Sequence, residues 1–237
     1  SSAASDVYKR QAFREDWYQL KFAIEYNRED YLNAEISAKE LLLNKPENKR
    51  YYVQLSAIYN ILEKYDLSLA TIEVSYMKGL LEKPEEFTNL ASFYLYKQNP
   101  AMSARVLETA LSNNNIEFDK ANAKLLSDAW LFAKERSRSL EVIGRSLDDD
   151  PKDEKLIKQY INIAFSAFNW DEVINGINRA NRNGVEDDGK HALMIGIAFF
   201  EKKNLKKAEA FFVDASKSKK YADQGKAWLE YLNALSG

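Results

Sequence analysis

The stretch HALMIGIAFFEKKNLKKAEAFFVDA, residues 191–215, contains two apolar runs separated by a charged break. Small and aromatic residues alternate along it, at Gly196, Phe199, Ala208, Phe212 and Ala215. Small side chains at helical spacing let two helices approach closely, and large side chains fill the space beside the crossing. The stretch therefore predicts two packed helices. We expect Gly196 and Ala208 at their crossing, and Ala215 where the second helix meets the next element.

The same order of large and small residues recurs along the chain. Leu55-Ser56 is followed by Tyr59, and Leu126-Ser127 is followed by Trp130 at the same spacing. The copies start near residues 15, 49, 84, 120, 154 and 189, in steps of 34 to 36 residues. This period, built on pairs of helices, is the signature of the tetratricopeptide repeat.

The repeats predict an all-α fold. We expect a right-handed superhelical α-α solenoid of about six tetratricopeptide helix pairs over residues 12–237, because only a neighbouring pair can cover the apolar face that each pair leaves. The terminal segment has Trp228, Tyr231 and Leu232 on one face and no second helix, so residues 222–235 are expected to form a capping helix. Residues 1–11, SSAASDVYKRQ, lie outside the repeat pattern and are interpreted as a non-native or disordered lead.

Composition restricts the class of partner. The 237 residues have a net charge of −2 at pH 7 and include no Cys. This charge provides no general attraction to nucleic acid, and the absence of thiols excludes disulfides and Cys-based metal sites. No apolar run approaches the roughly 18 residues of a membrane span. We therefore expect a protein or peptide partner, no nucleic acid and no direct membrane insertion of this segment.

No catalytic constellation is found in the sequence. His191 is the only His, so a two-His metal motif is excluded, and we expect it to be an exposed polar residue in the first turn of a helix. Asp148–Asp150 lack the Gly and the distal Glu of a calcium loop and instead favour a helix start. The sequence predicts a protein that is not an enzyme, with no catalytic residue, no metal site and no cofactor.

The repeat geometry predicts where a partner would bind. In a tetratricopeptide superhelix the first helices of the repeats line a concave groove, and register places the following residues on it: Asn60, Thr88, Tyr96, Lys124, Asp128, Phe132, Lys158, Asn162, Phe165 and Phe200. Aromatic anchors would give affinity for an extended peptide or a helix, and amide and ammonium donors would set its register. The sequence leaves open whether these aromatics face a partner or pack against neighbouring repeats.

Four phrases go beyond the general repeat pattern: 51–81, 93–117, LMIGIAFFEKKNLKKAEAFF at 193–212 and AWLEYL at 227–232. In this order they resemble the tetratricopeptide accessory proteins encoded beside TonB energy-transduction systems of Gram-negative bacteria. The resemblance implies a non-catalytic periplasmic scaffold that docks on a TonB-type complex and supports outer-membrane uptake of iron chelates. Members of that group usually have an export signal, which we expect upstream of this segment. The alternative is a tetratricopeptide chaperone or assembly factor for cell-envelope proteins.

Overall fold

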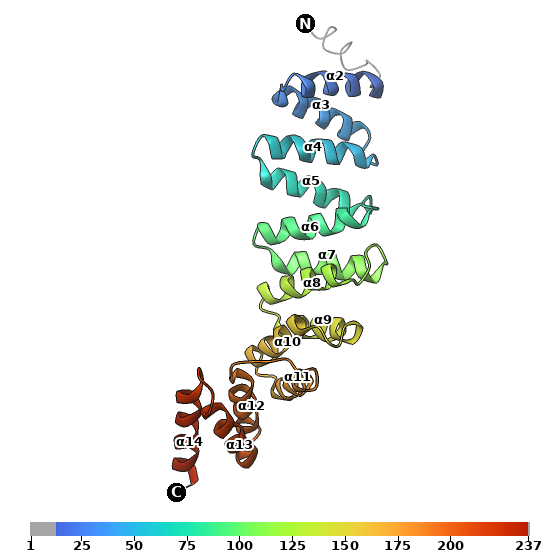
Figure 1. The fold of residues 1–237 in the computed structure, drawn as a ribbon. Helices are drawn as coiled ribbons and strands as arrows, with labels where there is room; N and C mark the ends of the chain where they lie inside the picture. The colour runs from blue at the N-terminus through green and yellow to red at the C-terminus, as the bar shows by residue number, and fades with distance from the viewer. Residues whose placement is uncertain (1–12, 237) are drawn as a thin grey trace. The chain divides into compact units, whose positions relative to one another are not determined.

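The computed structural model describes residues 13–236, and every regular element in that range is a helix (Figure 1). The predicted all-α fold of helix pairs is confirmed. The lead expected over residues 1–11 lies outside the described residues. The helices are α2 (Glu15–Asn27), α3 (Tyr31–Asn44), α4 (Lys49–Ile61), α5 (Tyr65–Met77), α6 (Pro84–Tyr96), α7 (Pro100–Ser112), α8 (Lys120–Phe132), α9 (Arg136–Asp149), α10 (Glu154–Ser166), α11 (Trp170–Arg182), α12 (Lys190–Glu201), α13 (Leu205–Ser216) and α14 (Ala222–Ser236).

Polar side chains begin several of these helices. The carboxylates of Asp119 and Asp153 each accept a hydrogen bond from a backbone N–H in the first turn of α8 and α10, and Asn48 does the same for α4. Such caps satisfy N–H groups that have no partner within the helix, and each contributes about 1 kcal/mol.

One turn conformation follows every first helix. The second residue after each of these helices has a φ between 56° and 63°, at Glu29, Glu63, Gln98, Lys134, Phe168 and Lys203. Beyond it, the backbone N–H of Asn169 reaches back to the carbonyl of Ala164, and that of Asn204 to Phe199. This is the Schellman arrangement, in which the left-handed residue is usually a glycine. Here the turn forms with other residue types.

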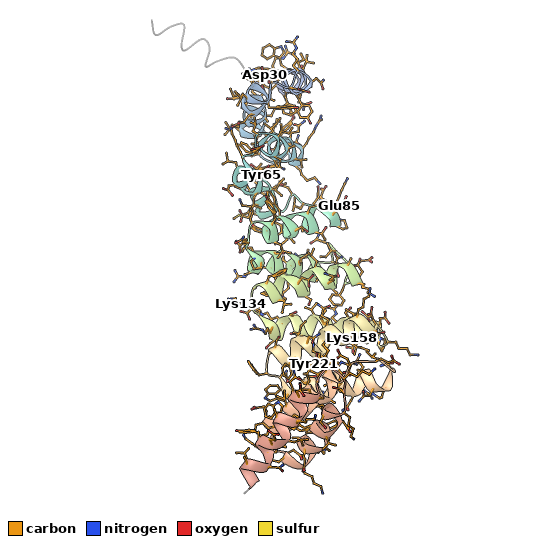
Figure 2. All side chains as sticks on the ribbon, turned by 60° about the vertical axis from the view of Figure 1, so that its left-hand side comes forward. Asp30, Tyr65, Glu85, Lys134, Lys158 and Tyr221 are labelled. Atoms are coloured by element: carbon orange, nitrogen blue, oxygen red, sulfur yellow. The ribbon has the colours of Figure 1, made fainter. Side chains whose placement is uncertain are left out.

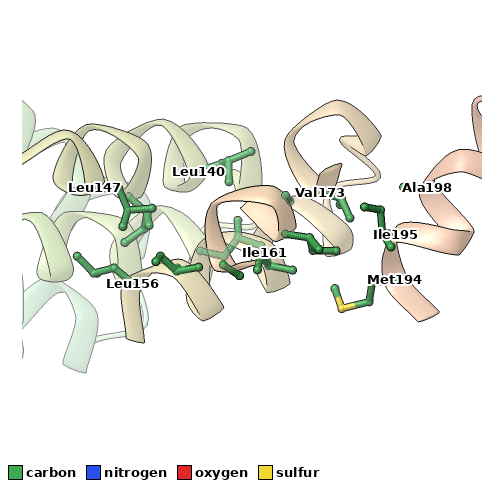
Figure 3. Packing of buried hydrophobic residues seen from close by; sticks show 14 residues of the cluster. Leu140, Leu147, Leu156, Ile161, Val173, Met194, Ile195 and Ala198 are labelled. Carbon is green, nitrogen blue, oxygen red and sulfur yellow. The ribbon is translucent and has the colours of Figure 1, made fainter. Parts of the chain in front are cut away.

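Two compact units make up the chain. The first extends to Gln98 and includes Thr109–Ile116, and the second comprises Asn99–Glu108 and the residues from Glu117 onward. In the first unit, the buried core joins α2, α3 and α4 through side chains such as Phe22, Leu41 and Tyr51. In the second, a continuous apolar core runs from Leu140 in α9 to Ala198 in α12 (Figure 3).

Small residues occupy the crossings inside the pairs. The hydroxyls of Ser56 and Ser68 lie 2.8 Å apart between α4 and α5, and those of Ser127 and Ser139 lie 2.9 Å apart between α8 and α9. Each pair of residues is separated by 12 positions in the sequence. The hydroxyls satisfy one another, so these polar groups can be buried where the helices approach.

In the last pair the crossing is made by glycine and an aromatic ring. A Cβ on Gly196 would lie 2.6 Å from the ring of Phe212, a separation that only glycine permits. The capping helix α14 approaches α13 in a similar way, since a Cβ on Gly225 would lie 2.9 Å from the backbone carbon of Ala215. Trp228 of α14 then stacks on Phe212 with 5.0 Å between ring centroids.

Ion pairs connect successive repeats within each unit. In the first unit Lys49 contacts Glu86, 37 residues away, at 3.2 Å. In the second, Lys120 pairs with Asp153, and Lys202 lies 2.6 Å from Asp171. The hydrogen bond from Lys120 and the backbone N–H of Leu156 hold the pKa of Asp153 below its ordinary value.

Candidate protein-binding face

The first helices of the first unit carry three of the predicted groove residues. Asn60 is exposed near the end of α4, and Tyr96, the last residue of α6, has 71% of its surface exposed. Thr88 is half-buried, and its hydroxyl donates to the carbonyl of Glu85 at 3.2 Å. These side chains are at least partly accessible.

Helix α8 of the second unit presents a charged pair and an open aromatic ring. Lys124 and Asp128 lie one turn apart and form an ion pair of 2.5 Å. Phe132 is the last residue of α8, and 68% of its surface is exposed. Phe168, in the same unit, has 72% of its surface exposed, and apolar side chains that lie singly on a surface are common in folded proteins.

A shallow cavity of about 510 Å³ lies beside that helix end. Its lining comes from α8 and α10: Leu131, Lys155, Lys158, Gln159, Asn162, Ile163 and Ser166. The structure therefore brings the predicted residues Lys158 and Asn162 together at one opening. Lys158, which lies at the surface in Figure 2, pairs with Glu154, and the amide oxygen of Asn162 accepts from the ammonium of Lys190 at 2.7 Å.

The other two predicted aromatics pack inside the protein. Phe165 is half-buried and contacts Trp170 edge-on at 5.7 Å, beside the core of the second unit. Phe200 is covered by the capping helix, with its ring centroid 5.1 Å from that of Trp228 and 5.8 Å from that of Tyr231. Tyr96 and Phe132 are thus exposed, whereas Phe165 and Phe200 are packed against other aromatic side chains.

Register alone did not single out several residues of the cavity. Lys155, Gln159 and Ser166 share the face of α10 that carries Lys158 and Asn162, because they follow one another at steps of three to four residues. That spacing is visible in the sequence. Leu131 could not be selected in this way, since it precedes the exposed Phe132 and its position depends on how α8 meets α10.

The expectation that His191 is exposed is wrong. Only 9% of its surface is accessible, and its Nδ1 lies 2.8 Å from a carboxylate oxygen of Asp187. The segment before α12 covers the ring, and Asp187 also accepts from the backbone N–H of His191. Burial lowers the pKa of His191, and the nearby Asp187 opposes this effect.

Over residues 13–236, no cluster of three or more His, Cys, Asp or Glu side chains is arranged to hold a metal ion. Within the same residues, none of the helices combines the length and apolarity that a membrane crossing requires.

Pairs of 12- to 14-residue helices, repeating every 34 to 36 residues, define an α-helical repeat protein with the dimensions of tetratricopeptide repeats. No protein-family model matches the sequence, and neither does any curated protein.

Three solved structures illustrate what the chain resembles. YrrB, described as a TPR protein with an unusual peptide-binding site, is 13% identical over 75% of this chain and 89% of its own, with a TM-score of 0.47. PilW, a type IV pilus biogenesis factor, is 14% identical over 92% of this chain and 100% of its own, with a TM-score of 0.46. A tetratricopeptide repeat protein from Parabacteroides merdae is 14% identical over 92% and 98%, with a TM-score of 0.39.

Proposed function

We propose that the protein is a non-catalytic scaffold and that the face formed by α8 and α10 binds a segment of a partner protein. The observation that carries the proposal is the exposed ring of Phe132, which directly follows Leu131 of the cavity that contains Lys158 and Asn162. An aromatic anchor next to hydrogen-bond donors is the usual arrangement for holding a peptide or a helix. Lys124 and Asp128, on the same helix as Phe132, would add charge complementarity along this face.

We further propose that the partner belongs to a TonB-type system in the periplasm of a Gram-negative bacterium. Support for this system comes from the phrases at 51–81, 93–117, 193–212 and 227–232, which resemble its tetratricopeptide accessory proteins. The role would be to help energise the outer-membrane uptake of iron chelates. The alternative, a chaperone or assembly factor for cell-envelope proteins, would bind different client proteins through the same kind of face.

The test is an affinity pull-down from a Gram-negative cell envelope with three baits. They are the wild type, a face variant (Phe132→Ala, Lys158→Glu) and a matched variant on α13 (Leu205→Ala, Lys206→Glu). All four substituted residues are at least partly exposed, so each variant is expected to remain within about 0.5 kcal/mol of wild-type stability.

Recovery of TonB-complex components by the wild type and the α13 variant, but not by the face variant, is the expected result. Equal recovery of these components by all three baits would disprove the role of the face, whereas the proposal that the partner belongs to a TonB-type system would stand. Recovery of only outer-membrane or pilus subunits would replace the TonB proposal with the chaperone alternative.

A further inference from the structure

A second, larger cavity lies in the second unit, between the second helices of two successive pairs. It has a volume of about 840 Å³, within the range of small-ligand sites. Its lining comes from α9, α10 and α11: Gly144, Leu147, Asp148, Tyr160, Glu172, Asn175, Gly176, Asn178, Arg179, Asn181 and Arg182. Apart from Leu147 and the two glycines, every one of these side chains can form hydrogen bonds.

Tyr160 makes this pair different from the preceding ones. In the repeat register its position holds Leu55, Leu90 and Leu126 in the three copies immediately before it. The larger ring lies between two helical glycines: a Cβ on Gly176 would be 3.1 Å from it, and a Cβ on Gly144 would be 3.4 Å away.

Packing requires glycine at only one of these two places. The Cβ of an alanine at position 176 would also meet Ile161 at 2.8 Å, whereas at position 144 it would make an ordinary contact. Glycine in the interior of a helix costs roughly 0.5–1 kcal/mol relative to alanine. Gly144 therefore reduces helix stability without relieving a clash, and its effect is to leave space in the cavity.

On the floor of the cavity, the polar side chains form hydrogen bonds with one another. The hydroxyl of Tyr160 donates to Glu172 at 2.5 Å, and Glu172 also accepts from the amide of Asn175 at 3.2 Å. Burial, together with the hydrogen bond to Glu172, raises the pKa of Tyr160, so the phenol remains neutral at physiological pH. Both hydrogen bonds fall on Oε2 of Glu172, so this oxygen is occupied by groups of the protein.

The rim has hydrogen-bond donors in excess. Arg179 donates one N–H to the carbonyl of Leu147 at 3.0 Å, and its nearest carboxylate oxygen, on the exposed Asp148, is 4.0 Å away. Arg182 has no ion pair or hydrogen bond with any described side chain, and it lies one turn further along the same face of α11. Two guanidinium groups with unused N–H groups match a carboxylate, which can accept two parallel hydrogen bonds from either of them.

We propose that this pocket binds a carboxylate-bearing ligand through Arg179 and Arg182, with Asn175 and Asn178 holding the neighbouring polar atoms. The carboxylate can belong to an acidic side chain of a peptide or to a free dicarboxylic acid. The site is separate from the face formed by Phe132 and the cavity of Lys158, so either proposal can fail without the other.

The experiment is a titration of the full chain, labelled with ¹⁵N, followed through the backbone amide signals of Gly144 and Gly176. The probes are acetyl-Gly-Gly-Glu-Gly-Gly-amide, the same peptide with Gln in place of Glu, and glutarate. Arg182→Gln removes the unpaired guanidinium, and Arg105→Gln makes the same change on the exposed face of α7. Gly144→Ala fills part of the pocket without a clash, and its titration is followed through the amide signal of Gly176 alone.

We expect the Glu peptide or glutarate to shift both glycine signals and the Gln peptide to leave them in place. Arg182→Gln should weaken this binding about tenfold or more, since a charge-assisted hydrogen bond is lost, and Gly144→Ala should weaken it too. Arg105→Gln should leave the affinity unchanged. If the Glu peptide binds more tightly than glutarate, the source of the carboxylate is a protein segment. If glutarate binds as tightly or more tightly, the source is a small molecule.

Three results would overturn the proposal: equal shifts with the Gln peptide, unchanged affinity in Arg182→Gln, or no shift with any probe at about 10 mM.

Discussion

At the scale of single residues, Gly196 and Gly144 are both helical glycines with different surroundings. A Cβ on Gly196 would lie 2.6 Å from Phe212, whose ring is fully buried, whereas a Cβ on Gly144 would be 3.4 Å from Tyr160. We expect Gly196→Ala to reduce the free energy of unfolding by about 1–3 kcal/mol through overpacking. Gly144→Ala should be neutral or raise it by about 0.5–1 kcal/mol. Equilibrium unfolding in urea measures both, and an equal effect of the two substitutions would contradict the crossing at Gly196.

His191 gives the protein a pH dependence that a single substitution can isolate. Burial lowers its pKa, with Lys158 and Lys190 acting in the same direction and Asp187 and Asp188 against it. The unfolded chain, with an ordinary pKa near 6.5, then binds the proton more readily than the folded chain. Stability is therefore complete above this pH and falls as the pH drops from about 6.5 toward the folded-state pKa.

We expect the melting temperature of the wild type to fall more than that of His191→Gln between about pH 7.5 and 5. His191 is the only His in the chain, and carboxyl groups of model peptides titrate near pH 4, so His191 is the side chain whose reference pKa lies in this interval. Parallel melting curves for the two proteins over this range would show that the burial of His191 is not maintained in solution.

At the scale of elements, the capping helix α14 completes the last pair. Trp228 stacks on Phe212 and also contacts Phe200, so its ring covers the end of the second unit's apolar core. We expect Trp228→Ala to cost about 2–4 kcal/mol, because large-to-small changes lose both burial and packing. Hydrogen exchange should show faster opening of α12, α13 and α14, while α8 and α9 keep their protection, since repeats depend mainly on their nearest neighbours.

Trp17→Ala is the control for this change, because Trp17 has 60% of its surface exposed in α2. It should leave stability within about 0.5 kcal/mol of the wild type. Uniform loosening of α8 through α14 in Trp228→Ala would instead mean that the second unit opens as one cooperative body.

The helices could be predicted from the sequence, whereas the turns between them could not. The recurring order of small and large residues predicted the helix pairs, because each slot is decided by contacts between residues about 12 positions apart, such as Ser127 and Ser139. The left-handed turns could not be predicted, since Glu63 and Lys134 give no glycine signal where φ is positive. Their conformation is imposed by the packing of the two helices that they join.

At the scale of the whole molecule, the candidate sites were only partly predictable. Periodicity placed Lys158 and Asn162 on one face of α10, and the structure joins them in one cavity. Periodicity could not show that Phe200 lies under the capping helix or that His191 is buried, because both positions depend on segments outside the repeat pattern. The pocket around Tyr160 was also missed, although a tyrosine in a leucine position near two helical glycines was visible in the sequence.

The ion pairs between repeats have a consequence for how the chain acquires its structure. The pair that is widest in sequence among the described side chains, Lys49 with Glu86, spans 37 residues. Contacts that are local along the chain close small loops at low entropic cost, and such topologies fold quickly. Within a unit, each pair can therefore assemble on its predecessor without waiting for distant parts of the chain.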